Sequence, residues 1–245
     1  TPKPLLPIQD KPIVEHITDK LQGLEVVDEI FVVTNQKFYT HFLEWNNSYK
    51  SSKHIKIIND LTTSNEDRLG SIGDINFVIQ QENLDDNLLI IGGDNLFKDD
   101  LHNFLQHFEQ HGSSILVNDV QSIERAKLFG IVIRDENNKI TEFIEKPENP
   151  SSTLSATLIY AIKKEHLSHI QGTIQQGLSD RAGDFIKHLS EQESVSALTL
   201  EGKWFDIGTL ELLNEANEEY YNENYYFWNR LCWFSNRIMP CKSRS

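Results

Sequence analysis

The chain has 245 residues, 38% of them hydrophobic, and its 23 basic and 37 acidic side chains give a formal net charge of −14. This length suits one large domain or two small ones and is sufficient for a hydrophobic core. The acidic balance argues against non-specific nucleic-acid binding, and no apolar run approaches the roughly 18 residues of a membrane-spanning helix.

The first half of the chain alternates short apolar segments, typical of buried strands, with segments of helical period. Helices are expected over residues 13–24, 38–45, 73–81 and 101–108. Strands are expected over residues 29–34, 54–60, 87–92 and 113–120. Continuous apolar strands that alternate with helices indicate a parallel sheet covered on both faces.

The pattern changes near residue 120. Segment 130–147 contains two strands joined by the turn Asp-Glu-Asn-Asn-Lys, which is typical of a hairpin. A further strand is expected over 155–162, a helix over 183–192 and strand character over 196–208. We therefore expect an α/β fold with a doubly wound, Rossmann-like mixed sheet and an inserted antiparallel portion.

The end of the chain has a distinct composition. Segment 219–245 is rich in tyrosine and tryptophan, and from Arg230 onward its only charged side chains are basic. It also holds both cysteines, which are too few for a disulfide framework, so we expect a protein of the reducing cytoplasm. The proline-rich start of the chain has no continuous apolar stretch, so we expect no signal peptide. We expect one domain over 1–217 and an aromatic, basic tail over 218–245. Three interpretations fit this tail: it docks on the core, it binds a partner or a membrane surface, or it originates outside the domain.

Ligands of open α/β sheets bind at the carboxyl ends of the strands. The strand over 87–92 is followed by Gly93, Asp94 and Asn95. Glycine permits close approach of a ligand, and Asp94 can hold a metal ion beside a phosphate. Gly-Asp-Asn is also ordinary turn chemistry, so a plain turn fits the same residues.

Asp206 forms a second strand-end candidate, in the sequence WFDIG. Its aromatic and apolar neighbours predict partial shielding from water, and a shielded carboxylate needs a partner. Asp206 therefore either caps the segment that starts near Thr209 or converges with Asp94 on a divalent cation bound to a nucleotide phosphate.

Lys146 lies in the sequence FIEKP, and Pro147 restricts it to extended conformations. A lysine fixed at a strand end can meet a phosphate as a point charge. Glu145 alternates to the opposite side in an ideal strand, although both side chains can face a cleft at a strand end. A surface Glu-Lys pair is the alternative. Lys3, in TPKPLLPI, is likewise flanked by prolines.

The sequence DRLGSIGDI places Gly70 and Gly73 at an expected helix start. Backbone N–H groups there can face an anion or the edge of a ring. The segment matches neither a phosphate-binding P-loop nor the dinucleotide fingerprint. A helix-entry loop without a ligand fits equally well.

The order of these motifs resembles the sugar-phosphate nucleotidyltransferase family, which includes glucose-1-phosphate thymidylyl-, uridylyl- and cytidylyltransferases. The resemblance runs from residue 1 to about 217 through PKPLLPI, LGSIGDI, IIGGDN, FGIV, ITEFIEKP and GKWFDIGT. It implies the fold expected above and the transfer of a nucleotidyl group from an NTP to a sugar 1-phosphate or similar phosphate monoester. The products would be a nucleotide-sugar and pyrophosphate. Mg²⁺ would be the cofactor, and many relatives form homo-oligomers.

The resemblance also implies roles for individual residues at the acceptor side. Asp94 and Asp206 would hold the Mg²⁺, and Lys146 would bind the sugar phosphate. Glu145 would bind the sugar hydroxyls, and Gly130 would let the sugar approach the backbone.

At the nucleotide side, Leu69, Gly70 and Gly73 would lie along the base or ribose, and Lys3 would meet the triphosphate. In the family, a first strand and a glycine-rich loop precede the segment that TPKPLLPI resembles. The resemblance therefore predicts a domain that is truncated at its N-terminus. Leu158 also departs from the family, since relatives usually carry a small residue there.

Two other functions remain open from the residues. A non-catalytic module of the same fold would bind a nucleotide or sugar phosphate without turnover. A glycosyltransferase would share the sheet and a metal-binding aspartate, but usually carries an Asp-x-Asp pair where this chain has Gly-Gly-Asp-Asn.

Overall fold

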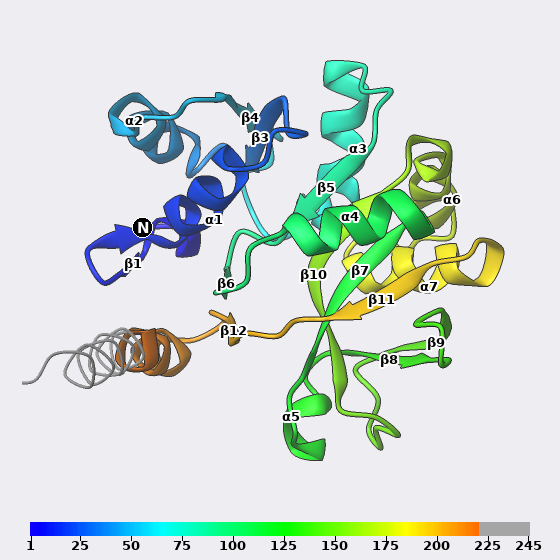
Figure 1. Cartoon of the computed structure of the whole chain (residues 1–245). Coiled ribbons are helices and arrows are strands. Elements are labelled where there is room, and N and C mark those ends of the chain that lie inside the picture. Colours follow the sequence, from blue (N-terminus) through cyan, green and yellow to red (C-terminus); the bar gives the residue numbers. More distant parts are fainter. Residues whose placement is uncertain (221–245) are drawn as a thin grey trace, which may run out of the picture.

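The computed structural model describes residues 1–220 as an α/β structure (Figure 1). Its strands are β1 (Pro7–Ile8), β2 (Lys11–Pro12), β3 (Glu29–Thr34), β4 (His54–Asn59), β5 (Leu88–Ile91), β6 (Asn95–Phe97), β7 (Ser114–Asp119), β8 (Gly130–Arg134), β9 (Ile140–Glu145), β10 (Leu154–Ile162), β11 (Ser196–Thr199) and β12 (Trp204–Asp206). Its helices are η1 (Lys3–Leu5), α1 (Ile13–Gln22), α2 (Tyr39–Ser48), α3 (Gly70–Glu82), α4 (His102–His111), α5 (Ile123–Ala126), η2 (Lys164–His166), α6 (Ser168–Gln175) and α7 (Ala182–Gln192).

A six-stranded mixed sheet forms the centre of the molecule. Its strands follow the order β11-β7-β10-β8-β9, and β5 also pairs with β10. β10 is antiparallel to β5, β7 and β8, whereas β11 and β7 are parallel. The hairpin expected over 130–147 is present as β8 and β9. The expectation of a mixed sheet with an antiparallel portion is therefore confirmed.

The parallel arrangement expected for the first half is only partly present. β3 and β4 form a parallel pair, but β5 pairs antiparallel with β10. The reason is that β10 lies between β5 and β7. Tyr160 is opposite Ile90 on one side and opposite Ile115 on the other.

Both faces of the sheet are buried, as the alternation along β10 shows. Tyr160 and Ile162 pack in a core with residues of α3, α6 and α7, and we call this side the α7 face. Ile159 and Ala161 point the other way, into a core with residues of α1 and α4. Figure 1 shows α6 and α7 grouped on one side of β10 and β7. Two covered faces explain why the strands read as continuous apolar runs.

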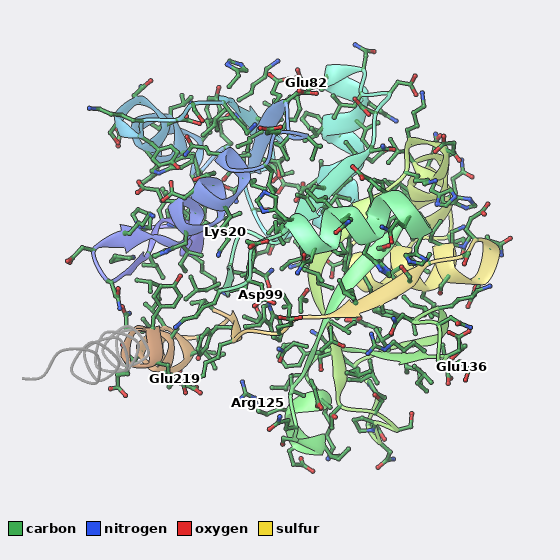
Figure 2. All side chains as sticks on the ribbon, in the orientation of Figure 1. Lys20, Glu82, Asp99, Arg125, Glu136 and Glu219 are labelled. Atoms are coloured by element: carbon green, nitrogen blue, oxygen red, sulfur yellow. The ribbon has the colours of Figure 1, made fainter. Side chains whose placement is uncertain are left out.

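The smaller β6–β12 pair lies against α1, near the start of the chain. Lys20 of α1 donates to the carbonyl of Lys98, just after β6, over 2.9 Å, and Figure 2 labels Lys20 close to Asp99 in the same region. After β12, residues 210–220 are helical. Tyr220 in this helix lies edge-on against His16, with ring centroids 5.3 Å apart. Most of the predicted tail, 221–245, lies outside the described residues.

No helix within residues 1–220 combines the length and apolar character that crossing a membrane requires.

Candidate active site

The carboxyl end of β5 brings two aspartates together. The chain turns tightly after β5, with the Asn95 N–H donating to the Gly92 carbonyl over 3.1 Å. β6 then pairs with β12 so that Asn95 is opposite Asp206. The Ile207 N–H donates to the carbonyl of Asp94 over 3.0 Å. Asp94 and Asp206 are therefore neighbours although they are far apart in the sequence.

Four charges converge at this strand end. Burial raises the pKa of the Asp206 carboxyl, and the negative charge of Asp94 raises it further. Lys3 and Lys146 act in the opposite direction on the same pKa, so both ammonium groups lie within electrostatic reach of Asp206. Within residues 1–220, no hydrogen-bond donor pairs with the Asp94 or Asp206 carboxylate. Two adjacent carboxylates without donors favour a bound cation.

The two structural alternatives for these aspartates have different outcomes. The Gly92–Asn95 segment is a turn, as the turn alternative predicts, and this turn is compatible with the predicted metal-binding role of Asp94. Asp206, in contrast, is not the cap of the following helix. That role falls to Thr209, whose Oγ1 accepts from the Leu212 N–H over 3.3 Å. The Asp206 side chain is therefore left for another partner.

Asp94 and Asp206 suit Mg²⁺ more than a metal held by protein ligands alone. Among residues 1–220 there is no cluster of three or more His, Cys, Asp or Glu side chains arranged to hold a metal ion. Mg²⁺ commonly binds through one or two carboxylates, with phosphate oxygens and waters completing its coordination. The two carboxylates present therefore fit a magnesium ion whose remaining ligands are phosphate oxygens and waters.

The backbone conformation of Lys146 differs from the predicted one. The sequence Lys-Pro predicts an extended backbone at Lys146, but its φ angle is +46°, in the left-handed region. The Gly130–Glu145 pair is the last rung of the β8–β9 ladder, and the Lys146 N–H donates instead to the carbonyl of Phe129 over 3.1 Å. This hydrogen bond turns the chain at the strand end. As a result, side chains no longer alternate strictly between the two faces of the sheet at this strand end. The charge of Lys146 accordingly reaches Glu145 and lowers its pKa.

Lys3 is held beside the turn that carries Asp94. Lys3 begins the short helix η1, in which the Leu5 N–H donates to the carbonyl of Pro2 over 3.0 Å. The ring of Pro4 lies against Gly93, where an added Cβ would be 3.1 Å from Pro4 Cγ. The prolines of TPKPLLPI thus fix an exposed lysine next to the strand end.

Glu145 occupies a half-buried position between two glycines. A Cβ on Gly130 would lie 2.5 Å from Phe143 Cζ and 2.9 Å from Glu145 Oε2. A Cβ on Gly183, at the start of α7, would lie 2.3 Å from the same Oε2. Burial raises the pKa of Glu145, and the charge of Lys146 partly offsets this. Gly183 was not among the predicted residues; the small residues that open the segment AGDF were its only sequence signal.

The start of α3 is packed against another loop. Gly70 has a φ of +80°, and a Cβ there would lie 2.5 Å from Asp180 Cα. The Ser71 N–H donates to the carbonyl of Asp180, and the Ile72 N–H donates to that of Ser179. These donors are therefore already used within the protein. Gly70 serves this close contact, which leaves little of the helix start free for an anion.

The remaining predicted residues at this helix, Leu69 and Gly73, touch each other. A Cβ on Gly73 would lie 2.8 Å from Leu69 Cβ, so the missing side chain gives Leu69 its place.

The next residue, Asp74, faces Asp60. Burial, the charge of Asp60 and a hydrogen bond with it raise the pKa of Asp74 to about 7. Asp60 itself accepts from the Thr62 N–H over 2.7 Å. This pair of carboxyl groups was not predicted.

The fold matches those of several solved structures. It matches a structure from Bacillus anthracis assigned as a glucose-1-phosphate thymidylyltransferase, with a TM-score of 0.72 and 24% identity over 89% of this chain and 86% of that one. It also matches a UDP-glucose pyrophosphorylase from Acinetobacter baumannii, with a TM-score of 0.70 and 17% identity over 97% of this chain and 92% of that one.

The sequence assigns the family. Residues 1–223 match the nucleotidyl transferase family, and the chain belongs to it. The bifunctional protein GlmU of Methanocaldococcus jannaschii is 33% identical over 218 residues, which cover 89% of this chain and 48% of that protein. The chain thus spans about half the length of this relative.

Proposed function

We propose that the protein transfers a nucleotidyl group from an NTP to a sugar 1-phosphate or a similar phosphate monoester. A phosphate oxygen of the acceptor attacks the α-phosphorus, and the bond from that phosphorus to the oxygen bridging the β-phosphate breaks. A nucleotide-sugar and pyrophosphate result. The observation that carries this proposal is the proximity of Asp94 and Asp206 at the end of β5, with Lys3 and Lys146 in electrostatic reach.

Each residue then has a defined task in positioning and charge neutralisation. Asp94 and Asp206 would hold Mg²⁺, which when bound neutralises charge on the reacting phosphates. Lys146 binds the acceptor phosphate, and Lys3 meets the triphosphate. Glu145 accepts hydrogen bonds from the hydroxyls of the acceptor.

Three glycines and one leucine complete the proposed site. Gly130 lets Phe143 and Glu145 pack directly against its backbone, and we place the acceptor beside this glycine and Glu145. Leu69, Gly70 and Gly73 form the edge along which the base or ribose lies. We place all of this machinery in a domain spanning residues 1–217.

The named functions of related proteins support this reaction. Among the structural matches are a UDP-glucose pyrophosphorylase in complex with UDP-glucose and a UTP-bound enzyme of the same kind. One such complex holds a nucleotide-sugar and the other a nucleoside triphosphate. These are the two kinds of molecule that the proposed reaction interconverts.

The test is release of pyrophosphate by the full chain. The folded protein is incubated with Mg²⁺, each common NTP and a panel of sugar 1-phosphates and other phosphate monoesters. We expect release with at least one pair, dependent on both substrates and on the metal. Ligand binding without release by a folded sample would contradict the proposal and would indicate a binding module.

A further inference from the structure

Leu158 has an unusual conformation at the centre of the sheet. Its φ angle is +56°, in a region that is uncommon for any residue except glycine and unfavourable for a leucine. The pairing of β10 with β7 shifts register between Ala156 and Tyr160, around this residue. The carbonyl of Leu158 accepts from the Gly92 N–H over 2.9 Å. The strained residue therefore touches the turn that carries Asp94.

The side chain of Leu158 lies beside the turn that carries Asp94. It packs on the α7 face of the sheet, the same face as Tyr160. Its Cδ2 is 3.5 Å from the point that a Cβ on Gly92 would occupy, and Asp94 Oδ1 is also 3.5 Å from that point. Tyr160, on the same face, lies within electrostatic reach of Glu145. Burial raises the pKa of Tyr160, and the charge of Glu145 raises it further.

The chemistry of this position is apolar. Leu158 is half-buried, and its only polar acceptor, the backbone carbonyl, is already used by Gly92. Glycines lie around Glu145 at positions 130 and 183, so they offer no competing side chain. Glu145 lies against Gly183 of α7, so an acceptor held by Glu145 would share the α7 face of the sheet with Leu158.

We propose that Leu158 selects the acceptor by placing an apolar wall against its sugar ring. The favoured substrate class is a deoxy sugar 1-phosphate, which lacks the hydroxyl that would otherwise face this leucine. A hydroxyl placed there loses water without gaining a hydrogen-bond partner. Apolar pockets discriminate against an added hydroxyl by up to about 10²-fold. This inference rests on the proposed nucleotidyl transfer.

The experiment compares kcat/KM for hexose 1-phosphates and their mono-deoxy analogues, using the full chain and its preferred NTP. Leu158→Asn is the main variant, because asparagine has a similar size, tolerates positive φ and adds a hydrogen-bonding amide. We expect the wild-type chain to prefer one deoxy analogue by about 10–100-fold. Leu158→Asn should lower this preference at least about tenfold and leave the KM for the NTP unchanged.

Leu61→Asn is the matched control. Leu61 is also a left-handed leucine, with a φ of +68°, but it is 67% exposed and lies in the loop after β4. It should keep the wild-type preference. If Leu158→Asn does not fold, Leu158→Gly tests the same wall by removing it, since glycine accepts this φ freely.

Two results would overturn the inference. The first is an equal kcat/KM of the wild-type chain for the deoxy and parent acceptors, or the same preference in the Leu158 and Leu61 variants. In either case the observed turnover still supports nucleotidyl transfer. Absence of turnover with every acceptor in every folded chain contradicts the proposed function, and this inference fails with it.

Discussion

Asp94 accepts a backbone hydrogen bond of 3.0 Å from Ile207, which fixes the neighbouring Asp206 beside it. The β6–β12 pair extends this contact and places Asp206 opposite Asn95. Two carboxylates are thereby held close together at the end of β5. In the proposed function a cation would relieve their repulsion, so the same contact would link metal binding, activity and stability.

Replacing Asp206 by asparagine should abolish activity and stabilise the metal-free protein. The loss of a metal ligand is expected to lower kcat/KM at least about 10²-fold. Burial and Asp94 raise the folded-state pKa of Asp206 above its ordinary value, so its ionised form lowers the free energy of unfolding as pH rises. Urea unfolding without Mg²⁺ should show the stabilisation of Asp206→Asn at pH 8 and little effect near pH 3.

The matched control for this variant is Asp10→Asn, at an exposed position. It should leave activity and stability unchanged at both pH values. Mg²⁺ with an NTP should raise the Tm of the wild-type and Asp10→Asn chains but not that of Asp206→Asn. An Asp206→Asn chain with full Mg²⁺-dependent turnover would remove Asp206 from the metal site.

Lys146 should not be replaceable by arginine. Its ammonium group is a compact charge at a left-handed strand end, whereas a guanidinium is planar and larger. Lys146→Arg and Lys146→Met are both expected to lower kcat/KM for the acceptor about 10²-fold, with little change in the KM for the NTP. Steady-state kinetics with each substrate varied in turn measures this. Lys127→Met, at a lysine paired with Glu124, should behave like wild type.

A methyl group at Gly183 should disturb Glu145. An added Cβ would lie 2.3 Å from Glu145 Oε2 and 2.9 Å from Phe143 Cε1, so one of these side chains must move. Gly183→Ala is expected to raise the KM for the acceptor at least about tenfold and to lower stability by about 1–3 kcal/mol. Gly23→Ala, whose new Cβ meets only the Lys20 carbonyl at 3.5 Å, is the control. Equal KM values in both variants would exclude a role for Gly183 in placing Glu145.

The Asp60–Asp74 pair should give the protein a second pH dependence. The folded-state pKa of Asp74 is about 7, against an ordinary value of 3.8, so the free energy of unfolding falls as pH rises between these values. Asp74→Asn is expected to stabilise the protein by about 1–3 kcal/mol at pH 8.5 and by almost nothing at pH 3.5, after allowance for solvent screening. Urea titrations at the two pH values measure this. Asp86→Asn, at an exposed carboxylate, should show no such difference.

The sequence predicted most elements of the fold but not all of their neighbours. Helical period placed α1 and α4, and continuous apolar runs placed β3, β5 and β10. Periodicity reports which faces of an element are buried, not which strand lies beside it. The insertion of β10 between β5 and β7 therefore could not be predicted, and β5 was assigned to a parallel arrangement that the structure contradicts.

Residue type at strand ends singled out Asp94 and Asp206, and the structure brings them together. The local conformation of Lys146 was wrongly predicted because the hydrogen bond to Phe129 outweighs the extended preference that Pro147 imposes. Gly183 belongs to no recognisable motif. It becomes significant only where α7 crosses Glu145, and such a long-range contact leaves no local pattern.

The most direct test of nucleotidyl transfer follows the α-phosphate itself. The full chain is incubated with Mg²⁺, an α-³²P-labelled NTP and the acceptors that support pyrophosphate release, with Asp206→Asn as the control. We predict that the label appears in a nucleotide-sugar or equivalent diester, in amounts equal to the pyrophosphate formed, and that Asp206→Asn forms almost none. Label recovered only as nucleoside mono- or diphosphate would show hydrolysis or phosphate transfer and would contradict nucleotidyl transfer at the Asp94–Asp206 site.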